Sequence, residues 1–170
     1  MKKTISILGS TGSIGLSSLS IIDKKKFYFK VRLLSANKNY SLICKQIKRY
    51  KPEFFVINDP LIFEKVKLKY KRKKVKILNN FDTLRVKKND IAISAIPGLK
   101  GLEPTLNLIK VSKKILIANK ESIICGWELI KKMSEKFKTE VVPVDSEHFS
   151  ILKLLENLNS NQIRKIYITA

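Results

Sequence analysis

Short apolar runs alternate along this chain with longer stretches in which apolar residues recur at every third or fourth position. The short runs, rich in β-branched residues, predict strands, and the helically spaced stretches predict helices between them. The expected strands are residues 4–8, 31–35, 54–57, 75–78, 90–96, 115–118 and 140–144. The expected helices are residues 14–22, 40–50, 61–70, 102–110, 121–137 and 151–158. This alternation predicts an α/β fold, a Rossmann-like parallel sheet with helices on both faces.

Two segments are ambiguous in this pattern. Residues 61–70 suit a helix, but Lys alternates with Val, Leu and Tyr over residues 65–76 in a way that suits a strand. Residues 166–169 form a last β-rich run. No Pro-, Gly- or Ser-rich linker and no low-complexity segment divides the chain, so composition marks no internal domain boundary.

The charge balance is strongly basic. Lys and Arg number 35 against 14 Asp and Glu, a formal net charge of +21, which suggests nucleic acid or an anionic membrane surface as a partner. Lys far outnumbers Arg, however, and Arg is the better bidentate reader of phosphates and guanines. A codon bias that fills the surface with lysines explains the charge better than nucleic-acid binding does. We therefore expect no nucleic acid and no membrane partner, with a basic α/β nucleic-acid-binding protein as the alternative.

The cysteines and the amino-terminal segment exclude several classes of protein. Cys44 and Cys125 lie far apart without CxxC spacing, and His148 is the single histidine, so we expect neither a disulfide scaffold nor a zinc site. The opening MKKTISIL is interrupted by GSTGSIG before it forms a secretory signal, and no apolar run approaches the roughly 18–20 residues of a membrane span. A soluble, cytoplasmic protein is expected.

A glycine-rich turn follows the first expected strand. Gly9, Gly12 and Gly15 stand between that strand and the first expected helix. Glycines there let a pyrophosphate approach the backbone, and the N–H groups at the helix start point at its phosphates. Ser10, Thr11 and Ser13 could donate further hydrogen bonds. An ordinary turn of an α/β protein is the alternative. Because residues 34–39 contain no acid to hold a ribose 2′-OH and include Lys38, NADPH is favoured over NADH.

Two carboxylates, Asp145 and Glu147, follow the strand expected at residues 140–144. At the carboxyl end of a strand, hard oxygen ligands of this kind suit Mg²⁺ or Mn²⁺. Alternatively they are the N-cap and first-turn acids of the next helix, with His148 as another polar residue of that turn. Residues 119–121, after another strand end, could likewise be a simple helix start.

Three motifs taken together resemble a known family. GSTGSIG at the first turn, ANKES at residues 118–122 and PVDSEH at residues 143–148 are similar, in order and spacing, to the successive signatures of 1-deoxy-D-xylulose 5-phosphate reductoisomerases. The resemblance runs over essentially all 170 residues.

The resemblance assigns roles to individual residues. It implies that NADPH is held by Thr11, Gly12, Ser13, Ile14, Asn37, Lys38, Asn39, Asn119 and Glu121. It implies that Lys120, Ser146 and Glu147 contact the substrate. Asp145 and Glu147 match two ligands of a divalent metal, for which Mg²⁺ and Mn²⁺ are the first candidates and Co²⁺ a third. Asn37 departs from a glycine common in the family, and Pro97 stands where a proline is unusual.

The resemblance also implies a reaction. A phosphosugar, 1-deoxy-D-xylulose 5-phosphate, would rearrange to an aldehyde, which NADPH would reduce to 2-C-methyl-D-erythritol 4-phosphate in isoprenoid precursor synthesis. Family members are more than twice as long and are expected to be homodimers. Residues 1–144 would form the NADPH-binding domain and residues 145–170 the start of the catalytic domain, so we expect the fragment alone to be inactive. Another NADP-dependent dehydrogenase is a further alternative.

Overall fold

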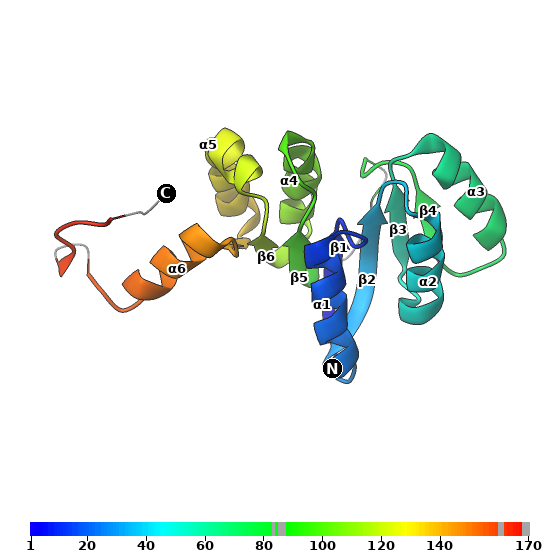
Figure 1. The fold of residues 1–170 in the computed structure, drawn as a ribbon, viewed down its shortest axis with the longest axis horizontal. Coiled ribbons are helices and arrows are strands. Elements are labelled where there is room, and N and C mark those ends of the chain that lie inside the picture. Colours follow the sequence, from blue (N-terminus) through cyan, green and yellow to red (C-terminus); the bar gives the residue numbers. More distant parts are fainter. Residues whose placement is uncertain (83, 85–87, 160–161, 168–170) are drawn as a thin grey trace.

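The structure is a computed structural model that describes residues 1–82, 84, 88–159 and 162–167 (Figure 1). Seven strands form one parallel sheet in the order β4-β3-β2-β1-β5-β6-β7. The strands are β1 (Lys3–Leu8), β2 (Phe29–Ala36), β3 (Phe54–Ile57), β4 (Lys76–Leu78), β5 (Asn89–Ser94), β6 (Ser112–Ile117) and β7 (Glu140–Pro143). The helices are α1 (Ser13–Lys24), α2 (Tyr40–Tyr50), α3 (Pro60–Tyr70), α4 (Leu102–Lys110), α5 (Lys120–Phe137) and α6 (Ser146–Leu155), with a 3-10 turn, η1 (Leu99–Gly101), before α4. The predicted Rossmann-like sheet is confirmed.

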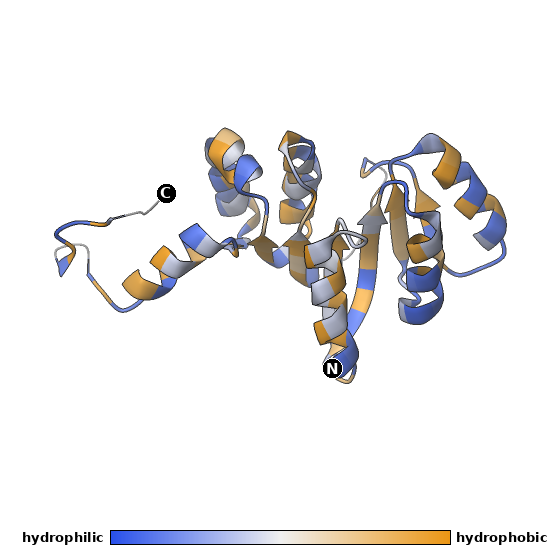
Figure 2. Ribbon diagram, viewed as in Figure 1, coloured by the Kyte–Doolittle hydropathy of each residue, from blue (hydrophilic) through white to orange (hydrophobic). Residues whose placement is uncertain are grey.

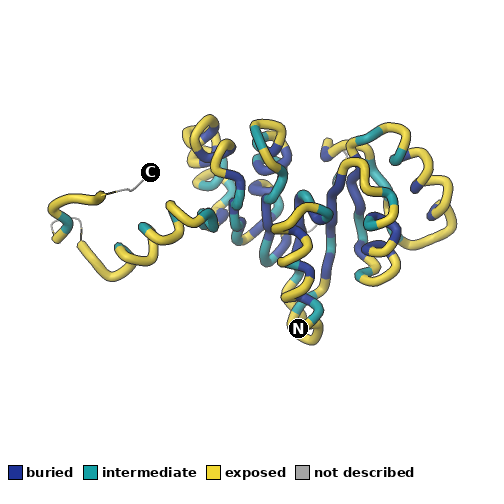
Figure 3. The backbone as a smooth tube through the Cα atoms, viewed as in Figure 1, coloured by how far each residue is buried: buried dark blue, intermediate teal, exposed yellow. Residues whose placement is uncertain are grey.

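The sheet buries both of its faces under helices. Apolar residues of α1, α2 and α3, such as Val66, pack on one face, and those of α4 and α5, such as Ile130, pack on the other. Side chains alternate between the two cores along β3, so that Phe55 joins the first and Val56 the second. Figures 2 and 3 show the apolar, buried strands at the centre and polar, exposed residues on the outer sides of the helices. Within the described residues, no helix is both long enough and apolar enough to cross a membrane.

The order of the strands creates a switch point between β1 and β5. From β1 the chain moves outward through β2 and β3 to β4, then returns to β5 beside β1 and proceeds to β7. The connections that leave the carboxyl ends of β1 and β5 therefore diverge to opposite faces of the sheet. In open α/β sheets this divergence leaves a crevice in which ligands bind.

The ambiguous segment at residues 61–70 is a helix, and the alternative strand over residues 65–76 is wrong. Asp59 caps α3 because its Oδ1 accepts a hydrogen bond of 3.0 Å from the Ile62 N–H, and Pro60 occupies the first turn. Both features are local signals of a helix start. The lysines of this segment are largely exposed, whereas Phe63, Val66 and Tyr70 are buried.

The last expected elements needed correction. The helix predicted at residues 151–158 begins earlier, at Ser146, and ends at Leu155, because Asp145 caps it. Ile166 and Tyr167 are not in a strand, so the strand expected at residues 166–169 is wrong for these two, and residues 168 and 169 lie outside the described residues. None of the residues of α6 is buried, and the helix extends away from the sheet (Figures 1 and 3).

Several strands are longer at their start than the apolar pattern predicted. β5 begins at Asn89 and β6 at Ser112, and the two residues are register partners that are fully buried. Neither residue is apolar, so hydrophobic periodicity did not include them. Their burial in the sheet comes from pairing with the neighbouring strand.

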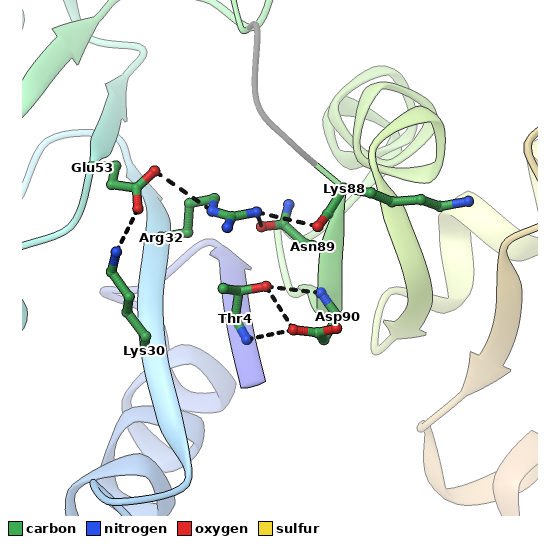
Figure 4. Close-up of polar contacts among 7 residues, drawn as sticks. All are labelled: Thr4, Lys30, Arg32, Glu53, Lys88, Asn89 and Asp90. Carbon is green, nitrogen blue, oxygen red and sulfur yellow. Dashed lines mark hydrogen bonds and ion pairs between the residues drawn. The ribbon is translucent and has the colours of Figure 1, made fainter. Parts of the chain in front are cut away.

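Polar side chains join the amino-terminal ends of the central strands (Figure 4). The Asp90 carboxylate accepts hydrogen bonds from the Thr4 N–H at 2.8 Å and the Thr4 hydroxyl at 2.9 Å, and it pairs with Lys113 at 2.8 Å. Arg32 reaches from β2 to the Asn89 side chain at 3.2 Å. These contacts tie β1, β2, β5 and β6 together at the edge opposite the switch-point crevice.

Candidate functional site

A cavity of about 550 Å³ opens at the carboxyl edge of the sheet, over the switch point. The connections that follow β1, β5, β6 and β7 line it. Nine residues singled out from the sequence are among the lining residues: Gly12, Ser13, Ile14, Asn119, Lys120, Glu121, Asp145, Ser146 and Glu147. The volume lies within the range of about 300–1,000 Å³ typical of small-molecule sites. The fold therefore brings three motifs that are far apart in the sequence to one cavity.

The glycine-rich turn has a shape that side chains would obstruct. Gly9 has φ +74°, and a Cβ there would lie 2.5 Å from the Ala95 carbonyl oxygen. A Cβ on Gly15 would collide with the backbone of Gly9 and Ser10. Close packing at these two positions lets α1 begin directly over the end of β1. Gly9 and Gly15 are thus required by the turn itself.

The start of α1 can receive an anion. Gly12 is its N-cap, no side chain in the described part of the chain caps it, and its first turn holds no acidic residue. Gly12, Ser13 and Ile14 are exposed at the cavity, and Thr11 is half-buried beside it. Backbone N–H groups and the positive helix end therefore face open space, which is the arrangement that binds phosphate groups.

Ser10 does not take part in the way the sequence suggested. Its side chain is fully buried, and its hydroxyl donates a hydrogen bond of 2.7 Å to Gln46 Oε1 of α2. The Gln46 amide donates in turn to the Ser10 carbonyl at 2.8 Å. The expectation that the Ser10 hydroxyl is available to a phosphate is wrong, because that hydroxyl is used inside the protein. No sequence motif pointed to Gln46, which lies 36 residues away in a helix.

The end of β2 lies beside the glycine-rich turn. The Ser10 N–H donates to the Ser35 carbonyl at 2.8 Å, and the Gly9 N–H donates to the Ser35 hydroxyl at 3.1 Å. Asn37 and Lys38, which follow β2, are exposed and are not among the lining residues of the cavity. The next residue, Asn39, caps α2 by accepting a hydrogen bond of 3.1 Å from the Leu42 N–H.

Asn119 holds two connections together at the cavity. It is 3% exposed, and its Oδ1 caps α5 by accepting from the Ser122 N–H at 2.9 Å. Its amide nitrogen donates to the Gly98 carbonyl at 2.8 Å and to the Ile96 carbonyl. The residue therefore fixes the connection after β5 against the start of α5. The expectation of a helix start at residues 119–121 is confirmed.

Asp145 acts as a helix cap and still has one oxygen available. Its Oδ1 accepts from the His148 N–H at 3.0 Å and contacts His148 Nδ1 at 2.7 Å. Its Oδ2 is buried and has no hydrogen-bond partner among the described residues. Burial alone raises the pKa of this carboxyl, but the hydrogen bonds from His148 outweigh it, and the pKa lies below its usual value. Asp145 is therefore a carboxylate with an unsatisfied oxygen at the cavity.

Glu147 and Lys120 add opposite charges to the same cavity. Glu147 Oε2 accepts a hydrogen bond of 2.6 Å from the Ser146 hydroxyl, which lowers the pKa of the Glu147 carboxyl. The Lys120 ammonium lowers that pKa further, while the Asp145 charge raises it. Glu147 and Lys120 are both exposed. Asp145, Glu147 and Lys120 thus place two carboxylates and one ammonium at the cavity, which Glu121 lines as a third acid.

The carboxylates of Asp145 and Glu147 suit a divalent cation. The unsatisfied Asp145 Oδ2 and the Glu147 carboxylate are the hard oxygen ligands that Mg²⁺ and Mn²⁺ prefer. Within the described residues, no three His, Cys, Asp or Glu side chains form a metal-binding group. Both residues of the predicted pair line the cavity, and the helix-cap role of Asp145 leaves its Oδ2 available because the cap uses only Oδ1.

The family model of 1-deoxy-D-xylulose 5-phosphate reductoisomerase matches residues 5–127. A curated protein of that name from Pelagibacter ubique is 51% identical over 99% of this chain and 45% of its own length. A second, from Clostridium novyi, is 37% identical over 99% of this chain and also 45% of its own length. The chain thus spans a little under half the length of these relatives.

Solved structures with the same name share the fold. The enzyme from Zymomonas mobilis in complex with NADPH superposes with a TM-score of 0.79 at 32% identity, over 87% of this chain and 40% of that one. A complex with NADPH, fosmidomycin and magnesium superposes with a TM-score of 0.76 at 28% identity, over 86% of this chain and 37% of that one.

Proposed function

The chain belongs to the 1-deoxy-D-xylulose 5-phosphate reductoisomerase family, and from this premise we propose that it supplies the NADPH site and part of the metal and substrate site of such an enzyme. The protein would convert 1-deoxy-D-xylulose 5-phosphate to 2-C-methyl-D-erythritol 4-phosphate in isoprenoid precursor synthesis. The observation that carries this proposal is the single cavity lined by the glycine-rich turn, Lys120 and the Asp145–Glu147 pair.

NADPH would lie along the carboxyl edge of the sheet. We propose that its phosphates meet the backbone at Gly12, Ser13 and Ile14, with Thr11 beside them, because this helix start is uncapped and exposed. The ribose phosphate would lie at Asn37, Lys38 and Asn39, where Lys38 adds a positive charge and the sequence has no acid. Asn119 and Glu121 complete the proposed set at the cavity. Bound NADPH supplies the hydride.

The carboxylates would hold the metal. Asp145 would bind through its unsatisfied Oδ2 and Glu147 through its carboxylate, whose pKa the Ser146 hydroxyl and the Lys120 ammonium lower. Mg²⁺ or Mn²⁺, or Co²⁺ as a third candidate, would supply Lewis-acid chemistry toward the oxygens of the substrate when held there. Keeping both pKa values low is the contribution of His148, Ser146 and Lys120.

The remaining side chains would orient the substrate. The exposed Lys120 ammonium attracts the anionic phosphosugar and can donate hydrogen bonds to its oxygens. The Ser146 hydroxyl, which bonds Glu147 at 2.6 Å, would turn toward the substrate. Asn119 would act indirectly, because its buried hydrogen bonds fix the backbone that carries Lys120. Holding the reacting groups in place in this way is itself a large part of catalysis.

Further proposals concern the domain boundary, the oligomeric state, the cellular location and the partners of the protein. We propose that residues 1–144 form the NADPH-binding domain and that residue 145 begins the catalytic part, in keeping with an α6 that has no buried residues. We also propose that the protein is a cytoplasmic homodimer. Its ligand would be the phosphosugar substrate, and it would bind neither nucleic acid nor membranes. The excess of Lys over Arg supports the exclusion of nucleic acid.

The test is a turnover assay with the purified full-length protein that contains this chain, because residues 1–170 alone are expected to be inactive. NADPH consumption should require both 1-deoxy-D-xylulose 5-phosphate and Mg²⁺ or Mn²⁺. The double substitution Asp145→Asn with Glu147→Gln should lower the rate by at least about 100-fold, because the metal loses its charged ligands. Glu156→Gln, which alters a carboxylate of the same region outside the cavity, is the matched control and should change little. Metal-independent turnover, or full activity in the double variant, would show that the pair has another role.

A further inference from the structure

A buried ring of hydrogen bonds joins the glycine-rich turn to α2. The Ser10 hydroxyl donates to Gln46 Oε1 at 2.7 Å, and Gln46 Nε2 donates to the Ser10 carbonyl at 2.8 Å. Ser10 is 0% and Gln46 4% exposed. The carboxamide of Gln46 thus matches both an acceptor and a donor on one residue of the turn. A primary amide presents a donor and an acceptor side by side, whereas a carboxylate presents acceptors only.

The ring continues into the end of β2. The Ser10 N–H donates to the Ser35 carbonyl at 2.8 Å, and the Ser10 hydroxyl also lies 3.0 Å from that oxygen. The Ser35 hydroxyl accepts from the Gly9 N–H at 3.1 Å. Gly9 and Ser10 are therefore held from two sides, by β2 and by α2. Because the side chains of Ser10, Ser35 and Gln46 are buried, loss of one of them leaves a buried polar group of another unsatisfied.

The residues next to this ring belong to the proposed NADPH site. Thr11, Gly12 and Ser13 follow Ser10 directly, so the anchoring of Ser10 determines where their backbone groups point. At its other end, α2 begins at the proposed ribose segment, because Asn39 is its N-cap. Gln46 lies on the same helix and is not among the residues that line the cavity. It can act on NADPH only through the turn.

We infer that Gln46 is a positioning residue that fixes the phosphate-binding turn relative to the ribose-binding segment. This inference rests on the proposed NADPH site. Ser10, Ser35 and Gln46 hold the turn in the shape that NADPH requires, so that the cofactor does not have to order it on binding. A preformed site binds more tightly than one that must be ordered.

The test is a titration of NADPH into the purified protein and three variants, each kept at a temperature at which circular dichroism shows it folded. Gln46→Met preserves the length of the side chain but removes both hydrogen bonds with Ser10, and we expect its NADPH dissociation constant to rise about 10-fold. Ser10→Ala, a smaller change, should raise the constant less. In the double variant, the loss of NADPH binding free energy should be clearly smaller than the sum of the losses in the two single variants, because both substitutions break the same ring.

A matched control separates positioning from general stability. The buried Thr139 hydroxyl contacts the carbonyls of Ile109 at 2.7 Å and Ser112 at 2.8 Å, at the amino-terminal edge of the sheet. Thr139→Val therefore removes a buried hydrogen-bonding group far from the site. It should lower the midpoint of urea unfolding as the Gln46 substitution does, but leave NADPH binding unchanged.

The outcomes distinguish this inference from the proposed function. If the unsubstituted protein binds NADPH and the folded Gln46→Met variant binds it equally well, the positioning role is refuted while the NADPH site stands. The same holds if Thr139→Val weakens binding as much as Gln46→Met, since the effect is then one of stability alone. If the unsubstituted protein does not bind NADPH, both are refuted. If Gln46→Met does not fold, Ser10→Ala decides, and an unchanged constant in that variant overturns the inference.

Discussion

Asp90 is predicted to stabilise the sheet where β1, β5 and β6 begin (Figure 4). Its carboxylate accepts two hydrogen bonds from Thr4 at 2.8 and 2.9 Å and pairs with Lys113 at 2.8 Å. A hydrogen bond to a charged group contributes about 1.5–3 kcal/mol when buried, and an exposed ion pair contributes about 0–1 kcal/mol. The Asp90 side chain is 29% and that of Lys113 is 65% exposed, so water replaces part of what is lost. We therefore expect Asp90→Ala to lower the free energy of unfolding by about 2–3 kcal/mol.

The pH dependence of this loss has a definite sign. The Lys113 ammonium and the two Thr4 hydrogen bonds hold the pKa of the Asp90 carboxyl well below its usual range. A carboxyl whose pKa is lowered by folding stabilises the protein above its unfolded pKa of about 3.9, and this stabilisation is lost as the pH falls toward the folded pKa. The difference between the unsubstituted protein and Asp90→Ala should thus be constant from neutral pH to about pH 5 and shrink below about pH 4.

The assay is urea unfolding of both proteins across this pH range. Removing any acid raises the net charge above +21, and this alone can change stability. The control for this effect is Glu128→Ala, which removes an exposed acid of α5 that forms no ion pair within the described residues. The control should change the unfolding free energy by less than about 0.5 kcal/mol. A loss of under about 0.5 kcal/mol in Asp90→Ala at neutral pH, or a loss that grows on acidification, would refute the reasoning.

Three further predictions concern the site. Gly15→Ala should lower the unfolding free energy by about 2–3 kcal/mol in a urea titration, because the added Cβ would collide with the backbone of Gly9 and Ser10. Gly12→Ala should fold normally, because its Cβ would lie 3.4 Å from the Gly9 carbonyl oxygen, but it should bind NADPH more weakly. Lys38→Ala should weaken NADPH binding about 10-fold in a fluorescence titration and leave NADH binding unchanged, so equal losses would contradict a role at the 2′-phosphate. Asp145→Asn with Glu147→Gln should abolish Mn²⁺ binding measured by electron paramagnetic resonance, and retained binding would place the metal elsewhere.

The sheet and the cavity were predictable because their signals are local. Period-two and helical spacings indicate strands and helices, and their strict alternation indicates a parallel sheet whose carboxyl edge collects the connections. Asp59 before Pro60 is likewise a local signal for the start of α3, although the lysines that alternate with apolar residues after it also suited a strand. Nine of the residues nominated in three motifs consequently line one cavity, whereas Thr11 and Ser10 of the first motif do not.

Contacts between distant residues could not be predicted. A serine in a glycine-rich turn suggests a phosphate ligand, but the hydroxyl of Ser10 is used by Gln46, which lies 36 residues away. Asp145 illustrates a different limit, because the helix-cap and metal hypotheses appeared to compete. The structure gives each carboxylate oxygen its own environment, so that Oδ1 caps α6 and Oδ2 is unsatisfied. Only the coordinates of single atoms separate such alternatives.

Calorimetric titration of the purified protein with NADPH and, in parallel, with NADH tests the proposed cofactor site most directly. The uncapped start of α1 and the exposed Lys38 predict one saturable NADPH site, with NADH bound at least about 10-fold more weakly. No saturable binding of NADPH, or equal affinity for the two nucleotides, would contradict the assignment of this cavity edge to NADPH.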